Sequence, residues 1–219
     1  MTRRTLSRWG ITMRYAGEEN DQYADGYKDW WDQRWRSDKG GDGTSTYGKL
    51  AETYRSKVQQ VVSQVKGLTV LDVGCGSLNQ WGGSLPVKEE NFYGLDVATP
   101  AITRSQGRHP KATFICADAT QDDIWREVPS VDVVTCTDML NHLHPGDYDT
   151  VLENMLFVAE KAVIIRMWHK KEWDGAGGYH WYHDVPAYNG WSVESTLTDD
   201  PVSPWTLHIC RRLPDADRQ

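Results

Sequence analysis

Five short apolar runs, separated by polar or amphipathic segments, constrain the fold of this chain more than any other feature. The runs are LTVLDV (68–73), NFYGLDV (91–97), ATFIC (112–116), VDVVTCT (131–137) and KAVIIRM (161–167). Strands that are apolar throughout are typical of parallel sheets buried on both faces, and helical crossovers connect such strands. The pattern therefore predicts an α/β fold, a three-layer sandwich around a mostly parallel sheet.

The segments around these runs complete the prediction. GDYDTVLENMLFVAE follows the fourth run and places Tyr148, Leu152, Met155 and Ala159 on one helical face, and TPAITRSQ follows the second run. Near the end of the chain, WSVEST (191–196) and PWTLHICR (204–211) flank the turn-rich LTDDPVS. A connection this short joins antiparallel strands. We therefore expect the sheet to end in an antiparallel hairpin.

The segment before the first run has a different pattern. Aromatic residues recur every fourth position over residues 23–35, which predicts a helix with one aromatic face. SDKGGDGTST then predicts a loop, and a second helical period starts at Tyr47. We divide the chain into an N-terminal segment (1–46: basic tail, aromatic helix, Gly-rich loop), a main domain (47–212) and a polar tail (213–219).

Composition excludes several classes of protein. The net charge of −7 disfavours a broad basic surface for nucleic acid. None of the four cysteines forms a C-x-x-C pair, so a zinc cluster has no support, and we expect reduced cysteines in a cytoplasmic protein. The sequence contains neither a signal peptide nor an apolar stretch of the roughly 20 residues that span a bilayer. We therefore expect no membrane association.

The first run leads into a glycine turn, VLDVGCGSLNQW (70–81). Gly74 and Gly76 let the backbone pass close to a ligand, and Asp96 ends the next run, where a carboxylate can bind both hydroxyls of a ribose. The dinucleotide fingerprint G-x-G-x-x-G is incomplete, because position 79 is Asn. Asp72 would sit poorly beside a pyrophosphate but suits the cationic amino-acid end of S-adenosylmethionine (SAM).

Four segments in order carry a family resemblance. VLDVGCGS, YGLDVATPAI, CADAT and VDVVTCTDMLNHL resemble the first four motifs of class I SAM-dependent methyltransferases, and the terminal hairpin fits their sheet. The resemblance implies a Rossmann-like fold with SAM as cofactor, in which Asp96 holds the ribose and Asp118 reaches the adenine amino group. The other residues that we expect at the cofactor are Asp72, Gly74, Cys75, Gly76, Asn79, Gln80, Val97, Ala119 and Thr137.

The resemblance extends upstream. WWDQRW, a Gly/Ser/Thr-rich run and YGKLAETYRSKV are similar to the leader of a group of bacterial and phage class I methyltransferases, whose first motif continues G-C-G-x-G-N-Q. This chain has Leu78 at the last glycine of that pattern.

In this family the segment before the first strand folds over the SAM site. The resemblance therefore implies that the aromatic helix (23–35) is a lid, hinged at residues 40–43. Arg34 would reach the SAM carboxylate or an acidic acceptor, and Tyr47 would line the methionine end. The alternative is a buttress that buries Trp31 and Trp35 on the edge of the sheet.

Two regions offer catalytic side chains. Asp138 and His142 follow the fourth strand, beside the expected methyl group, and His can accept a proton near neutral pH. The same histidine could instead pack under the cofactor or cap the next helix. The aromatic segment 168–191 adds His180 and His183 as candidates at the acceptor, or it only packs on the sheet edge. We expect no metal, because no H-x-x-x-H pattern is present.

These observations favour a methyltransferase that acts on a small molecule or a sugar, with oxygen as the methylated atom. The tetrapeptide N/D/S-P-P-Y/F/W, with which nucleic-acid amine methyltransferases hold the amino group, is absent after the fourth strand. A nucleotide- or nucleic-acid-modifying enzyme, phage-encoded for example, stays an alternative. So do a non-catalytic SAM-binding protein and, disfavoured by Asn79, an NAD-dependent oxidoreductase.

Overall fold

The structure is a computed structural model that describes residues 27–36, 48–63, 68–168, 181–197 and 205–214. Several sequence-based expectations lie outside these ranges: the basic tail, the glycines at 40–43, Tyr47 and His180. None of the helices in the described ranges is both long enough and apolar enough to cross a membrane.

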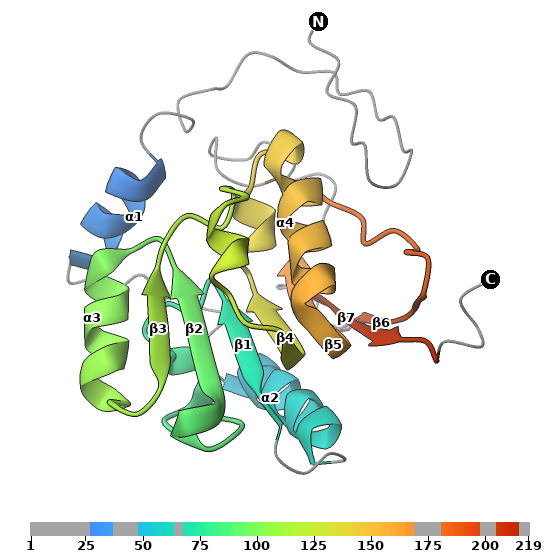
Figure 1. The fold of residues 1–219 in the computed structure, drawn as a ribbon, viewed down its shortest axis with the longest axis horizontal. Coiled ribbons are helices and arrows are strands. Elements are labelled where there is room, and N and C mark those ends of the chain that lie inside the picture. Colours follow the sequence, from blue (N-terminus) through green and yellow to red (C-terminus); the bar gives the residue numbers. More distant parts are fainter. Residues whose placement is uncertain (1–26, 37–47, 64–67, 169–180, 198–204, 215–219) are drawn as a thin grey trace, which may run out of the picture.

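A seven-stranded sheet in the order β3-β2-β1-β4-β5-β7-β6 forms the middle layer (Figure 1). The strands are β1 (Val70–Val73), β2 (Phe92–Asp96), β3 (Thr113–Cys116), β4 (Val131–Thr137), β5 (Ala159–Trp168), β6 (Trp191–Leu197) and β7 (Trp205–Arg212). β1 to β5 pair in parallel, and β7 runs antiparallel to both β5 and β6. Both the mostly parallel sheet and the antiparallel hairpin at its end are confirmed.

Helices cover both faces of the sheet (Figure 1). α2 (Gly48–Val62) packs on one face because its apolar positions, such as Tyr54 and Val58, recur at helical spacing and are buried. α3 (Thr99–Arg108) contributes Ile102 to the same cluster. α4 (Pro145–Val158) packs on the opposite face through Leu152 and Met155. These clusters form the core of the three-layer sandwich.

One helix boundary differs from the prediction. Ala159 was expected on the helical face of α4, but it is the first residue of β5. Its N–H closes the helix on the carbonyl of Met155, and its backbone then pairs with Val131 of β4. Pairing with a distant strand thus ends the helix, although the local apolar spacing continues.

α1 (Tyr27–Arg36) lies against the N-terminal end of α3 (Figure 1). Trp35 is buried against Ala98 and Ala101. Asp32 accepts a hydrogen bond of 2.9 Å from the backbone N–H of Thr99, the first residue of α3. A backbone N–H in the first turn of a helix has no intrahelical partner, so Asp32 satisfies it from a different helix. These contacts fix α1 at the end of the sheet where β2 stops.

Candidate cofactor and active site

The carboxyl ends of the central strands meet at one edge of the sheet. Val73 of β1 stands in register with Leu95 of β2 and Cys136 of β4. The loops after these strands therefore open side by side, at the topological switch point where open α/β sheets bind ligands.

The glycine turn after β1 contains three residues with left-handed backbone, Gly74, Gly76 and Leu78. Gly74 has φ 73°, and a β-carbon there would lie 2.5 Å from the Cβ of Met139, so only glycine fits. Leu78 adopts φ 64° and ψ 18°, a conformation that favours glycine. The side chain of Leu78 is buried, and this offsets the strain with apolar contact. The turn thus keeps a left-handed residue at position 78 without a glycine there.

Asp72 lies beneath the turn rather than in the open site. Its side chain is fully buried, and its Oδ2 accepts hydrogen bonds from Gln80 Nε2 (2.6 Å) and Trp81 Nε1 (2.9 Å). Thr135 Oγ1 donates to Oδ1 at 2.8 Å. Burial raises the pKa of Asp72 from 3.8 to about 6, although these hydrogen bonds work in the opposite direction. Asp72 therefore ties β1, β4 and the turn together, and the expected contact with SAM stays a prediction.

Asp96 joins the first two loops. Its Oδ2 accepts the N–H of Gly76 and its Oδ1 accepts the N–H of Ala98, both at 2.8 Å. Two bonds from the backbone, one to each oxygen, fix the orientation of the Asp96 carboxylate. This oriented acid at the end of β2 suits the two hydroxyls of a ribose.

Asp118 follows β3 and is held in a similar way. The backbone N–H and the hydroxyl of Thr120 both donate to its Oδ1, at 2.9 and 2.8 Å. The carbonyl of the neighbouring Ala119 accepts a hydrogen bond of 2.9 Å from Trp125 Nε1. Since both bonds from Thr120 end on one oxygen, the local turn orients the carboxylate for a donor such as an amino group.

The remaining predicted cofactor residues divide by environment. Cys75 is buried, and burial raises the pKa of its thiol, so its expected contact with the cofactor stays a prediction. Val97 is also buried. Asn79 accepts a hydrogen bond of 3.2 Å from Arg108 Nη1. Arg34 is exposed on α1, with its guanidinium 5.3 Å from the ring centroid of Trp30.

Asp138 directly follows β4 and forms an ion pair. It has φ 60°, which is uncommon for a residue other than glycine, and strain of this kind clusters at functional sites. Arg166 donates from Nε to Oδ1 (3.1 Å) and from Nη2 to Oδ2 (2.5 Å). Both carboxylate oxygens thus bond to one guanidinium fork, which fixes the orientation of the carboxylate. The pair therefore favours a positioning role for Asp138 over the expected role of base.

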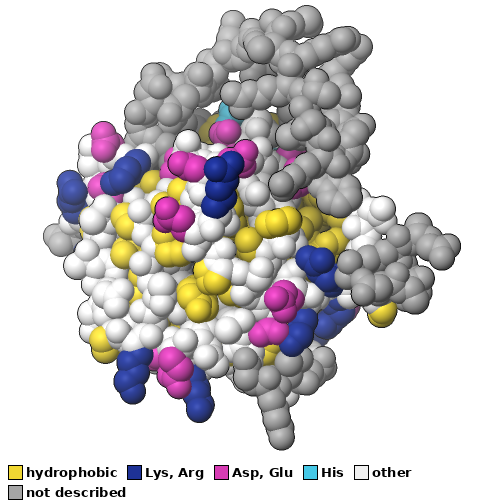
Figure 2. Space-filling view, viewed as in Figure 1, with side chains coloured by type: hydrophobic (Ala, Val, Ile, Leu, Met, Phe, Trp, Pro, Cys, Tyr) yellow, Lys and Arg dark blue, Asp and Glu magenta, His cyan; other side chains and the backbone are white. Residues whose placement is uncertain are grey.

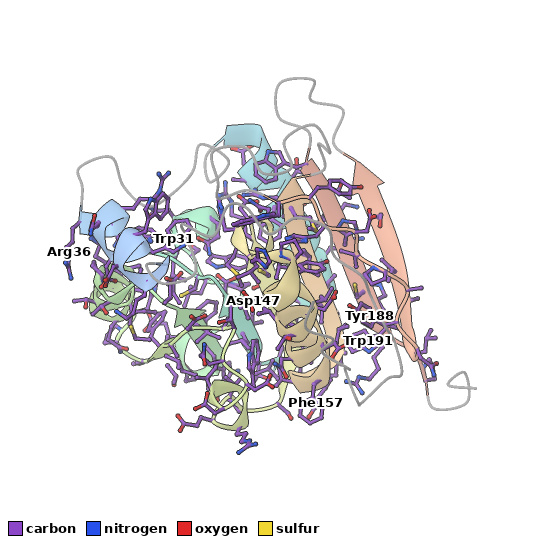
Figure 3. All side chains as sticks on the ribbon, turned by 90° about the horizontal axis from the view of Figure 1, so that it is seen from above. Trp31, Arg36, Asp147, Phe157, Tyr188 and Trp191 are labelled. Carbon is purple, nitrogen blue, oxygen red and sulfur yellow. The ribbon has the colours of Figure 1, made fainter. Side chains whose placement is uncertain are left out.

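His142 ends a short 3₁₀ helix, Leu140–His142, beyond β4. Its ring meets the Trp31 ring of α1 edge to face, with centroids 5.1 Å apart. Figure 3 looks onto this edge of the sheet and shows Trp31 pointing from α1 toward the body of the molecule, whereas Arg36 points away. α1 thus brings an aromatic side chain to the predicted base, which neither spacing nor composition indicated.

His183 takes a structural place in the described molecule. Its ring stacks on Tyr148 of α4 with a centroid distance of 4.1 Å, and its Nε2 donates to the carbonyl of Leu143 at 3.0 Å. These contacts attach the segment after residue 180 to the first turn of α4, and the predicted role of His183 at the acceptor stays untested. Within the described ranges, no three His, Cys, Asp or Glu side chains form a group that could hold a metal ion.

Sequence reasoning missed two residues that organise this edge. Arg166 stands in the apolar run KAVIIRM and is 3% exposed. A charged residue within a buried strand is itself a signal of a paired or functional group. The sequence around Asp32 gave no such signal. Asp32 bonds to the first turn of α3 only because α1 packs against α3, and local sequence does not show that packing.

The comparisons with known proteins agree with this geometry. Residues 70–161 match the family model described as "Methyltransferase domain". The chain resembles the structure of magnesium protoporphyrin IX methyltransferase from Synechocystis with bound S-adenosylhomocysteine (SAH). That likeness has a TM-score of 0.59 and 19% identity and covers 88% of this chain and 97% of that one.

A second solved structure with bound SAH, the N-methyltransferase NodS from Bradyrhizobium japonicum, gives a TM-score of 0.63 at 12% identity. It covers 86% of this chain and 99% of NodS. A third, the 1,6-didemethyltoxoflavin-N1-methyltransferase of Burkholderia thailandensis, gives 0.62 at 12% identity, covering 92% and 94%. At these identities the likeness shows the fold.

Among curated proteins, phosphoethanolamine N-methyltransferase 1 of Zea mays is 23% identical over 115 residues, which are 51% of this chain and 23% of that protein. The corresponding protein of Triticum aestivum is 24% identical over 110 residues, 49% of this chain and 22% of that protein. The match thus spans about a quarter of the length of these relatives. Residues 70–161 therefore carry a methyltransferase domain, and the strand order and the solved structures show the Rossmann-like fold of class I SAM-dependent methyltransferases.

Proposed function

We propose that this protein binds SAM and transfers its methyl group to a hydroxyl of a small molecule or sugar. The observation that carries the proposal is the convergence of the glycine turn, Asp96, Asp118 and His142 on the carboxyl edge of a methyltransferase-domain sheet. Solved structures with this fold hold SAM or SAH. When bound, SAM supplies an electrophilic sulfonium methyl group.

The residues of the chain divide the work of binding. The turn at Gly74 and Gly76 allows close backbone approach, Asp96 is oriented for the ribose, and Asp118 is oriented for the adenine amino group. The amide oxygen of Asn141, beside His142, is buried without a hydrogen-bond partner. Buried polar atoms without partners mark places that a ligand completes, so the described site fits a polar ligand.

His142 is the proposed general base. It follows β4, where the acceptor meets the methyl group, and the edge-to-face contact with Trp31 limits the orientations of its ring. A neutral imidazole there can remove the proton of an attacking hydroxyl. An amine acceptor that reacts in its neutral form needs no such base during the attack, which is why His142 favours oxygen.

Charge supports a small acceptor. The face in Figure 2 carries Lys and Arg side chains interspersed with Asp and Glu, and the net charge is −7. Surfaces that bind the phosphate backbone of a nucleic acid carry clustered positive charge instead. The curated relatives are named as N-methyltransferases of phosphoethanolamine. The test below therefore includes acceptors with an amino group.

The test measures SAH release with matched acceptor pairs: a phenol and its aniline, a sugar alcohol and its amino sugar. We expect turnover of a hydroxyl member and a loss of about 100-fold or more in kcat for His142→Ala, with unchanged affinity for SAH. His208→Ala is the matched control, since His208 bonds Ser195 on the hairpin at 2.8 Å. Turnover of the nitrogen members alone, or unchanged kcat in His142→Ala, contradicts the proposal.

A further inference from the structure

Arg166 is a buried cation on the face of the sheet that α2 covers. It is 3% exposed and stands in register with Thr137 of β4 and Leu207 of β7. Its guanidinium carbon lies 5.3 Å from the ring centroids of both Tyr54 and Trp205. A charge in such a place is unfavourable unless it is paired or completes a binding site.

Asp138 pairs only part of the guanidinium. The fork formed by Nε and Nη2 holds both carboxylate oxygens, at 3.1 and 2.5 Å. The other amino group, Nη1, is buried without a hydrogen-bond partner. Arg166 is therefore held rigidly by one acid while one side of its planar fork still offers donors.

Two hydroxyls share this condition. The oxygens of Tyr54 and Thr137 are also buried without partners, and the two groups lie close together although their geometry stops short of a hydrogen bond. Burial raises the pKa of Tyr54, so its hydroxyl keeps its proton. Buried polar atoms that lack partners cost stability, so three at one place need an explanation.

We propose that Arg166, Thr137 and Tyr54 form a carboxylate-binding subsite at the carboxyl ends of β4 and β5. All three groups can donate hydrogen bonds, and a planar carboxylate accepts several donors at once. Asp138 already holds the arginine in one orientation. Binding therefore does not cost the conformational entropy that a freely rotating side chain would lose.

The subsite borders the cofactor turn. Asp138 is followed by Met139, the residue that packs directly on Gly74. A carboxylate at this place has two sources: the methionine end of SAM, or an acidic acceptor. Only the identity of the ligand rests on the proposed function. The three buried donors are present in the chain whichever ligand they bind.

Isothermal titration calorimetry with two probes tests the proposal: SAH, and the SAH analogue that lacks the carboxylate. The variants are Arg166→Lys, which keeps the charge but loses the fork, and the near-isosteric Tyr54→Phe and Thr137→Val. If the cofactor is the source, Arg166→Lys binds SAH about tenfold or more weakly and binds the analogue as the wild type does. The hydroxyl variants show the same selectivity with smaller losses.

An acidic acceptor predicts a different result. The variants then bind SAH as the wild type does, and benzoate titrated into the SAH-saturated protein shifts the Arg side-chain NMR signals of the wild type but not of Arg166→Lys. Arg212→Lys is the matched control, because the Arg212 guanidinium also lies over a tryptophan, Trp191, at 4.8 Å. It should behave as the wild type with every probe.

The failure of this inference and the failure of the proposed function give different results. If all three variants bind SAH, the analogue and benzoate as the wild type does, the subsite is wrong and the cluster is purely structural. If Arg166→Lys fails to fold, the two hydroxyl variants decide by the same criterion. If the wild type binds no SAH, the proposed function fails, and benzoate titration of the protein without SAH still decides the subsite.

Discussion

Asp72 shows how a single buried carboxyl can organise a binding loop. It accepts hydrogen bonds from Gln80, Trp81 and Thr135, so one side chain connects β1, β4 and the turn that follows β1. Burial raises its pKa to about 6, which makes its ionisation unfavourable for the folded state. The molecule keeps this acid because the turn needs acceptors for the side chains of Gln80 and Trp81.

The raised pKa gives a prediction for stability against pH. The contribution of Asp72 is fully present below its unfolded pKa of 3.8 and is lost as the pH rises through the folded pKa of about 6. The difference in unfolding free energy, wild type minus Asp72→Asn, should therefore fall by about 2 kcal/mol between pH 4 and 7. Urea unfolding at a series of pH values measures it.

Asp132→Asn serves as the control for that series. Partial burial opposes ionisation of Asp132, but hydrogen bonds from Lys161 and Thr69 outweigh it and lower the pKa. Its contribution is present above the unfolded pKa and is lost as the pH falls, so its difference should change in the opposite direction. A flat curve for Asp72→Asn, beside a sloping one for Asp132→Asn, would show that Asp72 titrates as in the unfolded chain.

Gly74 gives a second prediction for a single residue. Gly74→Ala places a β-carbon 2.5 Å from the Cβ of Met139, in a left-handed conformation that alanine rarely adopts. We expect a loss of about 2 kcal/mol or more in unfolding free energy, together with weaker SAH binding. Thermal unfolding with and without SAH measures both effects.

Gly107→Ala is the matched substitution. Gly107 lies in α3, and a β-carbon there would meet no atom within 4 Å. This variant should gain about 0.5–1 kcal/mol, because alanine favours the helix. Equal losses in both variants would mean that the turn has no special need for glycine at position 74.

At the scale of elements, α1 is the helix that lies at the carboxyl edge of the sheet rather than on one of its faces. It is attached through Trp35 and through the bond from Thr99 to Asp32, and it reaches His142 through Trp31. We propose that α1 roofs the cofactor and acceptor sites. Its attachment to α3 combines the two alternatives, since a helix that buries Trp35 can still cover the site with Trp31.

This role of α1 predicts the effects of two substitutions. Trp35→Ala removes the buried anchor, and Asp32→Ala removes the acceptor of the Thr99 N–H, a bond of about 1 kcal/mol. Hydrogen exchange of residues 27–36 should become faster in both variants, and SAH binding should weaken by about tenfold in Trp35→Ala. Calorimetry and exchange mass spectrometry provide the measurements.

The exposed Asp29 on α1 supplies the control, as Asp29→Asn should change neither quantity. If Trp35→Ala accelerates exchange in α1 but leaves SAH binding unchanged, α1 is a buttress that does not cover the site.

The sequence predicted the elements better than their contacts. Seven strands were predictable because apolar runs and turn residues are local signals, and the order of the motifs located the cofactor edge. Three features were not predictable, because each depends on residues that are distant in sequence. They are the helix boundary at Ala159, the pairing of Asp138 with Arg166 and the cap of α3 by Asp32. Leu78 shows a further limit: buried contacts let leucine occupy a position whose backbone favours glycine.

For the whole molecule, every loop that carries a motif ends at one edge of the sheet, and α1 adds a further side chain there. The acidic groups on that edge, Asp96 and Asp118, are oriented by hydrogen bonds from their own neighbours. This arrangement is organised before ligand binding and needs little ordering to accept a nucleoside.

Binding of SAH to the full chain, measured by isothermal titration calorimetry beside NAD, tests the central claim most directly. The arrangement predicts one SAH site with a dissociation constant in the micromolar range, weakened about tenfold or more in Asp96→Ala, which loses the acid oriented for the ribose. It predicts no comparable binding of NAD. Absence of SAH binding at millimolar concentration, or a preference for NAD, would contradict the claim that this edge of the sheet is a SAM site.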